Sequence, residues 1–361
     1  MRKRNGRATA AASIALAFRT SGLMLALHFG LAQLCASPTT AQPAATKLAA
    51  TKPAATKSTA TQAVGAKAPG APLAAVKMIP FNFPPESSLA VLDVSAPYTK
   101  PDGTPAIKFT KMQARGLIHI PSNASINIIF SYYGLEHLDA FVQLKAVNVT
   151  QMNASRLEMD DKQAEVLRNF PNFLRMNFDN TLITDKTLAI IHTFKNLDDL
   201  RISATDITGS GFDQLDGLPI TNFNMGSLSL KPNMMSKFKS LPSTVTSLNC
   251  TRCQLGPAEI SFVGKCHKLV ALDIGGNKAL NDVTIKEFSN LKLLDYINVA
   301  DTSVTDKSLP FLAKLPSLHK ITIRANHFWT VNKIKSPRPD LIVEDVTGSA
   351  RAPVEVFDPL H

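Results

Sequence analysis

Three cysteines stand close together in the chain, and thiols at such spacing could hold a metal ion or form a redox pair. Cys250 and Cys253 are separated by two residues, and Cys266 follows 13 positions after Cys253. Thiolates in pairs of this kind are frequent zinc ligands and redox centres. A disulfide between Cys250 and Cys253 is disfavoured, because three residues of extended chain span about 10 Å and a disulfide tolerates about 7 Å between Cα atoms. A metal site and buried, unpaired thiols remain as interpretations.

Acidic side chains at two Thr-Asp turns resemble catalytic acids or calcium ligands. The turns are Ile183-Thr184-Asp185 and Val304-Thr305-Asp306, and each directly precedes a segment expected to be helical. Thr and Asp at such positions accept hydrogen bonds from free backbone N–H groups, so we expect them to cap helices. The histidines follow no ligand spacing, and we find no phosphate-binding loop, nucleophile elbow or metal-binding helix. The sequence therefore predicts a protein that is not an enzyme, with no catalytic residue, metal or cofactor.

The elements that must position these residues repeat along the chain. Each repeat has an apolar residue, two others, a second apolar residue, one other and a third apolar residue. This series runs Leu144/Val147/Val149, Phe173/Met176/Phe178, Leu197/Leu200/Ile202, Ile220/Phe223/Met225, Val245/Leu248/Cys250, Leu269/Leu272/Ile274, Leu294/Ile297/Val299 and Leu318/Ile321/Ile323. The first interval is 29 residues, and the next are 24, 23, 25, 24, 25 and 24. A second apolar series between them recurs at helical spacing, as in Leu188/Ile191/Phe194 and Ile285/Phe288/Leu291.

The two spacings predict two kinds of element. A strand alternates its side chains between its faces, so the last two apolar residues of each strand point inward and the residue between them points outward. Triads spaced by three residues form a stripe on a short helix that packs behind the strand. One unit cannot bury its apolar face, but stacked units share a continuous core. We therefore expect an α/β solenoid with a parallel sheet on one side and helices on the other.

The repeat register also decides between the interpretations of the cysteines. Cys250 takes the inward strand position, Cys253 takes an interior turn position, and Cys266 takes the third position of a helical triad. Small or apolar residues fill these positions in the other units, and free cysteine is commonly buried. We therefore predict buried thiols in place of a metal site or a disulfide.

Asparagine is concentrated at the outward position of the predicted strands. Unit by unit, this position holds Asn148, Asn177, Arg201, Asn224, Asn249, Asp273, Asn298 and Thr322. Because Asn is disfavoured in strands, the row requires a reason. Either stacked amides bond to one another along the sheet, or the row presents donors and acceptors to a ligand. For the second case we name Asn177, Arg201, Asn224, Asn249, Asp273, Tyr296 and Asn298 as candidate ligand-binding residues, with Arg201 and Tyr296 as the strongest anchors.

The units resemble leucine-rich repeats. They are most similar to the cysteine-containing repeats of 24 to 26 residues found in F-box adaptor proteins and in many exported bacterial proteins, whose strand is followed by an Ile-Thr-Asp turn. This chain has that turn or a close variant at 183–185, 207–209 and 304–306, whereas Leu230-Lys231-Pro232 and Leu255-Gly256-Pro257 replace it in two units. The resemblance covers residues 135–343. It implies a concave parallel sheet, short helices on the convex side, and recognition of a protein or glycan partner.

Almost all of the net positive charge of the chain is carried by its N-terminal part. Ten of the 39 basic residues lie in residues 1–77, which contain no acidic residue, and the remaining 29 basic residues accompany 28 acidic ones. The repeats are thus close to neutral and give no reason to expect a nucleic-acid partner. Residues 1–41 have the basic start, apolar stretch and small-residue exit of a secretory signal, with an uncleaved anchor as the alternative. The Ala/Lys/Pro/Thr composition of residues 42–77 predicts a disordered tether. Its lysines could contact an anionic envelope surface.

Two further segments complete the expected organisation. Residues 78–134 predict a β-rich section that caps the N-terminal end of the repeats, and residues 344–361 form a C-terminal tail. The sequence as a whole predicts an exported, non-enzymatic binding module that is periplasmic, at the cell surface or secreted. The alternatives are a structural cell-envelope protein held by its basic tether and an intracellular adaptor.

Overall fold

The computed structural model describes residues 76–324 and 338–346. The expected signal segment (1–41), residues 42–75 of the expected tether and residues 347–361 of the expected tail lie outside the described residues. Within the part of the chain that is described, no helix is long and apolar enough to cross a membrane.

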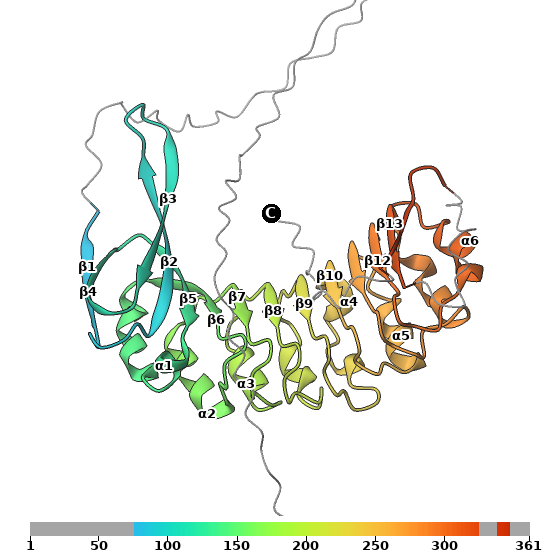
Figure 1. The fold of residues 1–361 in the computed structure, drawn as a ribbon, viewed down its shortest axis with the longest axis horizontal. Helices are drawn as coiled ribbons and strands as arrows, with labels where there is room; N and C mark the ends of the chain where they lie inside the picture. Colours follow the sequence, from blue (N-terminus) through green and yellow to red (C-terminus); the bar gives the residue numbers. More distant parts are fainter. Residues whose placement is uncertain (1–75, 325–337, 347–361) are drawn as a thin grey trace, which may run out of the picture. The chain divides into compact units, whose positions relative to one another are not determined.

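Most of the described chain forms one sheet of twelve strands with short helices along its convex side (Figure 1). Along the sheet the strand order is β14-β13-β12-β11-β10-β9-β8-β7-β6-β5-β2-β3. The strands that form the repeats, all pairing in parallel, are β6 (Asn148–Asn153), β7 (Arg175–Asn177), β8 (Asp199–Arg201), β9 (Asn222–Asn224), β10 (Ser247–Asn249), β11 (Ala271–Asp273), β12 (Tyr296–Asn298), β13 (Lys320–Ile323) and β14 (Ile342–Asp345). This topology confirms the predicted leucine-rich-repeat solenoid.

Short helical segments connect the strands, and many are 3-10 helices of a single turn. Their bounds are α1 (Tyr132–Leu135), η1 (Leu138–Ala146), α2 (Asp161–Ala164), η2 (Glu165–Asn169), α3 (Thr187–Ile191), η3 (Phe212–Leu215), η4 (Met235–Lys237), α4 (Leu241–Thr244), α5 (Pro257–Val263), η5 (Thr284–Asn290), η6 (Asp306–Ser308) and α6 (Leu309–Leu312). Such short helices are not stable alone, so their packing against the sheet must hold them.

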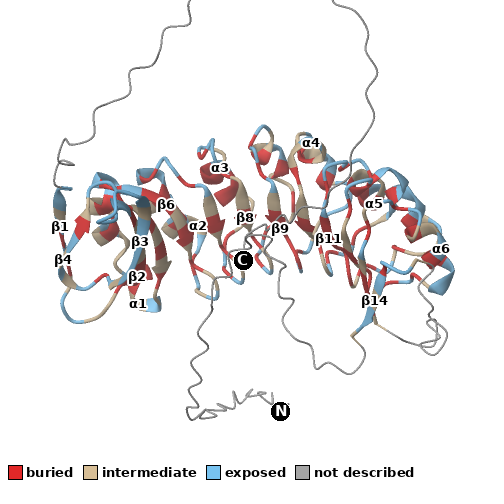
Figure 2. Ribbon diagram, turned by 90° about the horizontal axis from the view of Figure 1, so that it is seen from above, coloured by how far each residue is buried: buried red, intermediate tan, exposed pale blue. Residues whose placement is uncertain are grey.

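The core lies between the sheet and the helices and continues through every unit (Figure 2). The middle residue of each repeat strand enters it, and Met176, Leu200 and Phe223 align in adjacent strands with at most 1% of their surface exposed. Aromatic rings fill the space behind them, and the ring centroids of Phe173 and Phe194 lie 5.1 Å apart in an edge-on contact. The shared core explains why one apolar pattern can specify the whole array.

The N-terminal section, expected to cap the repeats, extends their sheet by three strands. Its strands are β1 (Met78–Phe83), β2 (Ala90–Thr99), β3 (Pro105–Gln113), β4 (Gly116–Pro121) and β5 (Ser125–Phe130). β2 pairs antiparallel with β3 and β5, and β5 pairs in parallel with β6. β1 and β4 form a separate antiparallel pair. Consequently β3 is the edge strand at this end of the sheet.

The first repeat unit has a different register from the one expected. Asn153, and not Asn148, stands opposite Asn177, because β6 pairs Met152 with Met176 and Asn153 with Asn177. Asn148 instead pairs with Ser125 of β5. The expected strand series began too early because the small Ala154, fully buried, occupies the third apolar position. With this correction the interval of 29 residues disappears, and the step from Asn153 to Asn177 is 24.

Aspartates at three of the turns that lead into the helical segments connect successive units. At the turn of residues 183–185 the threonine accepts as expected, with Lys186 N–H donating to the Thr184 hydroxyl at 3.3 Å. Asp185 itself does not cap α3, whose N-cap residue is Lys186. The Asp185 carboxylate instead accepts from the Thr208 backbone N–H at 3.0 Å, the Thr208 hydroxyl at 2.7 Å and the Gly211 N–H at 2.9 Å. Asp161 and Asp282 accept from the next unit's threonine in the same way. At the last turn Thr305 does cap η6, accepting from Lys307 N–H.

In the two units that lack this turn, a buried glutamate supplies the missing acceptor. Glu259 is 6% exposed, and its carboxylate accepts from the backbone N–H of Asn233 in the preceding unit and from Gly256 N–H in its own unit. Pro257 begins α5 at a position where its missing N–H is not needed. The two units that lack the turn are therefore connected by a glutamate in place of an aspartate, and their strands still stack in the sheet.

Candidate binding face of the sheet

The concave face of the sheet carries parallel rows of side chains, two of which run through the repeat strands. The central row is Asn153, Asn177, Arg201, Asn224, Asn249, Asp273, Asn298 and Thr322, aligned strand by strand. Two residues earlier in each strand lies the first row: Gln151, Arg175, Asp199, Asn222, Ser247, Ala271, Tyr296 and Lys320. The structure thus places the candidate ligand-binding residues together, with Tyr296 in the first row and the others in the central row.

The oxygen atoms of the central row are used within the protein. Five asparagines and one aspartate of the row each accept from the backbone N–H two residues further on, where the strand ends and the chain turns. These bonds run from Ser155 to Asn153 (2.8 Å), Asp179 to Asn177 (2.9 Å), Gly226 to Asn224 (3.2 Å), Thr251 to Asn249 (3.0 Å), Gly275 to Asp273 (3.2 Å) and Ala300 to Asn298 (2.9 Å). Within the described part of the row, no amide bonds to an adjacent amide. Asn is therefore favoured here as a turn former and not as a stacked ladder.

Two aspartates, Asp179, which is partly buried, and Asp273, which is buried, accept from some of the amide N–H groups. Asn224 donates to Asp179 at 3.2 Å, and Asn298 donates to Asp273 at 3.2 Å. Burial raises the pKa of both carboxyls to about 6, although the hydrogen bonds they accept oppose that rise. The amides of Asn177 and Asn249, by contrast, donate to no other described residue. The row thus offers free N–H donors at some positions and titratable carboxyls at others.

Arg201 lies within a small charged network. Its Nε is 3.4 Å from an Asp199 carboxylate oxygen, and the other oxygen of Asp199 accepts from Asn222 at 2.9 Å. Beside them Asp198 buries its Oδ1 with no hydrogen-bond partner, and burial raises the pKa of this carboxyl. The Arg201 side chain is about one quarter exposed, at 24%. Its guanidinium is held in place and retains donors that can reach a ligand.

Tyr296 occupies the other end of the face. Burial raises the pKa of its hydroxyl to about 12. The Lys320 ammonium lies 5.8 Å from the ring centroid, and it also pairs with Glu344 at 2.9 Å. The tyrosine is thus kept neutral and packed, as a preformed contact residue requires.

Among the described residues, a second aromatic side chain, Phe109, shares this face of the sheet with Tyr296. The sheet register continues from Gln151 through Asn127 and Asp93 to Lys111, which puts Phe109 on the same face of β3. Phe109 is 78% exposed. The alternation in residues 105–113 was the available signal, but the antiparallel pairing that aligns β3 with the repeats could not be read from it.

The three cysteines lie in the core, as the repeat register predicts. All are fully buried and unpaired, and Cys253 donates to the Met225 carbonyl at 3.0 Å. Burial raises the pKa of Cys253 and Cys266 to about 12, and that of Cys250 well above its ordinary value. Within the described residues, no group of three or more His, Cys, Asp or Glu side chains could hold a metal ion.

Together the stacked units, the parallel sheet and the polar face define a repeat solenoid of the leucine-rich class. Among solved structures, an internalin, inlF, of Listeria monocytogenes is similar, at 15% identity over 56% of this chain and with a TM-score of 0.43. This chain covers 55% of that protein, about half its length. Internalin C2 of the same organism is similar at 20% identity over 58% of this chain and 83% of its own, with a TM-score of 0.42. No family model and no curated protein match the sequence.

Proposed function

We propose that this protein is a non-enzymatic binding module that recognises a protein or glycan partner through its concave face. The supporting observation is the central row, in which polar side chains follow one another at every strand from β6 to β13 and no helix of the described residues covers them. Parallel strands are about 4.8 Å apart, so the row is long enough for an extended peptide or several sugar rings. The contact residues that we propose are Asn177, Arg201, Asn224, Asn249, Asp273, Tyr296 and Asn298.

The free groups of the central row are hydrogen-bond donors, so the partner must supply acceptors. The asparagine oxygens are engaged in turns, whereas the amides of Asn177 and Asn249 and the Arg201 guanidinium are donors. Backbone carbonyls, carboxylates and sugar hydroxyls are acceptors that match them. Arg201 and Tyr296 are the anchors of this face, since Arg and aromatic residues dominate binding energy at interfaces.

The remaining proposals concern the parts of the chain outside the described residues. In our proposal residues 1–41 export the protein, and residues 42–77 hold it by a basic tether that contacts an anionic envelope surface. A structural envelope role through this tether, and an intracellular adaptor role, are the competing functions. Nucleic acid is not among the proposed partners, because the basic excess is confined to residues 1–77.

The experiment replaces donors without disturbing the turns. Asp273 shows that a carboxylate keeps the turn bond, so the double variant Asn177→Asp/Asn249→Asp retains the acceptor oxygens and loses the amide donors. We expect partner capture from envelope extracts to fall by about tenfold or more, which corresponds to about 1.4 kcal/mol, with an unchanged melting temperature. Asn169→Asp/Asn290→Asp, at exposed positions on η2 and η5, adds the same charge elsewhere and is the matched control. Unchanged capture by the double variant, with retention still dependent on residues 42–77, would favour the envelope role.

A further inference from the structure

The edge strand β3 is open to a further strand. It lies at the end of the strand order, so one side of its backbone has no partner strand among the described residues. Its nine residues, Pro105–Gln113, are mostly exposed, including Ile107 at 58% and Phe109 at 78%. Proteins commonly shorten, bulge or cover such edges, because free backbone groups recruit other chains. β3 is long, and its only proline is at its first position, where it leaves the rest of the edge open. Lysine side chains are therefore the feature of β3 that opposes pairing with other chains.

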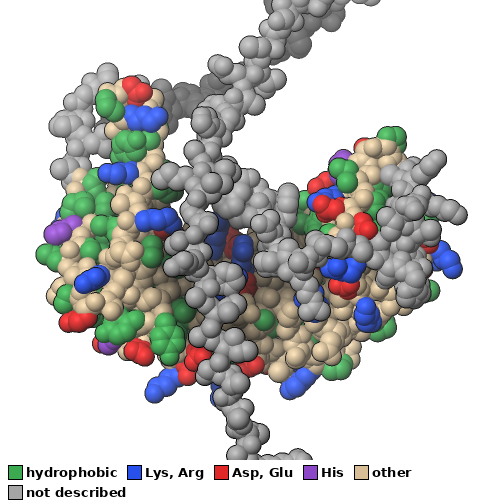
Figure 3. Space-filling view, in the orientation of Figure 1, with side chains coloured by type: hydrophobic (Ala, Val, Ile, Leu, Met, Phe, Trp, Pro, Cys, Tyr) green, Lys and Arg blue, Asp and Glu red, His purple; other side chains and the backbone are tan. Residues whose placement is uncertain are grey.

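Those lysines also give the edge a charge preference. Lys108 and Lys111 are exposed, and basic side chains follow the β2–β3 hairpin (Figure 3). β3 contains no acidic residue. Lys111 pairs with Asp93 of β2 at 2.9 Å, but 76% of the lysine side chain remains exposed. Two identical β3 strands would bring like charges together, whereas an acidic strand would neutralise them.

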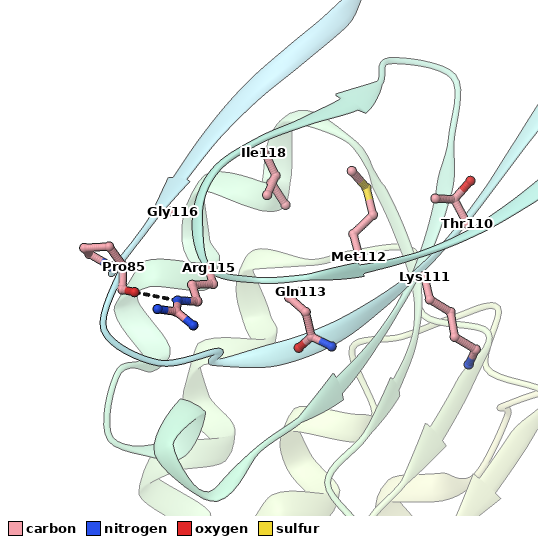
Figure 4. A pocket seen from close by; sticks show the side chains of 8 residues that line it. All are labelled: Pro85, Thr110, Lys111, Met112, Gln113, Arg115, Gly116 and Ile118. Atoms are coloured by element: carbon pink, nitrogen blue, oxygen red, sulfur yellow. Dashed lines mark hydrogen bonds between the residues drawn. The ribbon is translucent and has the colours of Figure 1, made fainter.

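A shallow pocket of about 650 Å³ lies beside the second half of β3. Figure 4 shows Met112 of β3 and Ile118 of β4 on its wall, with Thr110 and Gln113 along the strand. Arg115 is held at one end by a 2.5 Å hydrogen bond from its Nε to the Pro85 carbonyl. The pocket therefore offers space for apolar side chains of a strand that pairs with β3.

One segment of this chain has a sequence complementary to that edge. Residues 354–358 read Val-Glu-Val-Phe-Asp and lie between Pro353 and Pro359. One antiparallel register pairs Lys108 with Asp358, Phe109 with Phe357, Thr110 with Val356, Lys111 with Glu355 and Met112 with Val354. Both lysines then face acids, the two phenylalanines face each other, and the valines lie on the pocket side. The prolines would end the added strand at both sides, because they cannot donate to the sheet.

The segment follows the end of the sheet that lies farthest from β3 in the strand order. The described chain leaves the sheet after β14, which is at the opposite end of the twelve-strand order from β3 (Figure 1). Along the curved sheet, at about 4.8 Å per strand, the path between the two edges is roughly 53 Å. The eight steps from Val346 to Val354 span at most about 28 Å, about half of that path. A second molecule is therefore the source of the segment in our proposal.

We propose that β3 accepts residues 354–358 of a second copy as an added antiparallel strand, joining copies head to tail. Such an interface uses different surfaces on the two molecules, so it can propagate into chains of copies. Main-chain hydrogen bonds supply the affinity, and the Lys–acid pairs select the register. This assembly is independent of ligand binding at the central row.

Charge reversal tests the register directly with the full chain. We expect sedimentation velocity to show concentration-dependent association of the wild type. Lys108→Glu/Lys111→Glu and, separately, Glu355→Lys/Asp358→Lys should each raise the dissociation constant by about tenfold or more, since two attractive pairs become repulsive. Combining all four changes should restore association, because both pairs are again opposite in sign. Lys286→Glu/Lys314→Glu makes the same change in net charge at exposed positions elsewhere and should leave association unchanged.

Several outcomes would overturn the proposal. A wild type that is monomeric at every concentration would show that β3 is protected by its lysines alone, or that the segment binds elsewhere. Association lost in the β3 variant but retained in the 355/358 variant would show that β3 pairs with another β3. Failure of the fourfold variant to recover, with an unchanged melting temperature, would reject the register.

Discussion

At the scale of single residues, an asparagine amide of the central row can serve two roles with two different atoms. Its oxygen has the structural role, and its N–H group, where no aspartate accepts from it, is available for binding. The oxygen of Asn249 holds the turn at Thr251, while its N–H group is directed away from that bond and remains available. Asp273 performs the structural half of this role at the next strand. An alanine at position 249 would remove both halves together. Substitution by aspartate is therefore the informative change on this face.

The cysteines give a second prediction at the residue scale. Because Cys250, Cys253 and Cys266 are fully buried and burial raises the pKa of each thiol, we expect them to react with iodoacetamide only after unfolding. Mass spectrometry of residues 42–361 before and after urea treatment should count them. The exposed variant Ser229→Cys is the control for labelling in the native state. Rapid labelling of the three native thiols would contradict their assignment to the core.

At the scale of elements, the units depend on the aspartate that connects each turn to the next. Asp185 satisfies three donors of the following unit. Asp185→Ala should lower the free energy of unfolding by about 1–3 kcal/mol, because the Thr208 and Gly211 donors lose their acceptor. Urea denaturation monitored by circular dichroism measures this change.

Asp213 is the control for the loss of a carboxylate that makes no such connection. It is exposed on η3, and among the described residues its side chain accepts no hydrogen bond. Asp213→Ala should therefore stay within about 0.5 kcal/mol of the wild type. Equal losses for the two variants would mean that the loss at Asp185 does not come from the connection between units.

At the scale of the whole molecule, the buried carboxyls predict how stability depends on pH. The pKa values of Asp179 and Asp273 are raised from 3.8 to about 6 by burial. The folded protein therefore holds these protons more tightly than the unfolded chain does. Their contribution to stability is present below about pH 4 and is lost as pH rises through 6. We expect the melting temperature to fall between pH 4 and pH 6 and to change little from these groups above pH 7.

Two substitutions test the source of this slope. Asp273→Asn removes one of the two groups and should flatten the fall in melting temperature between pH 4 and pH 6. Asp216→Asn should leave that slope unchanged, because hydrogen bonds from Ser240 outweigh a burial effect and lower the pKa of Asp216, so that its titration lies below this range. A slope that is identical in the wild type and in Asp273→Asn would show that other groups control the pH dependence.

The sequence by itself determined the repeat, its parallel sheet, its helical side and the core positions of the cysteines. These follow from apolar spacing, because stacked units bury the same positions again and again. The sequence also located most of the central row, since the outward position is determined by the strand alternation. It misplaced the first unit because alanine at position 154 provides too weak an apolar signal to mark the strand.

Only the tertiary structure decided what depends on contacts between distant residues. The link from Asp185 to Thr208, the buried carboxyls of Asp179 and Asp273, and the placement of Phe109 on the concave face all join separate units or strands. A one-residue change in register moves every side chain of a strand to the opposite face. The pairing of β2 with β3 and β5 therefore had to be known before β3 could be recognised as an exposed edge. The reason is physical: local spacing sets the elements, whereas pairing and burial set their chemistry.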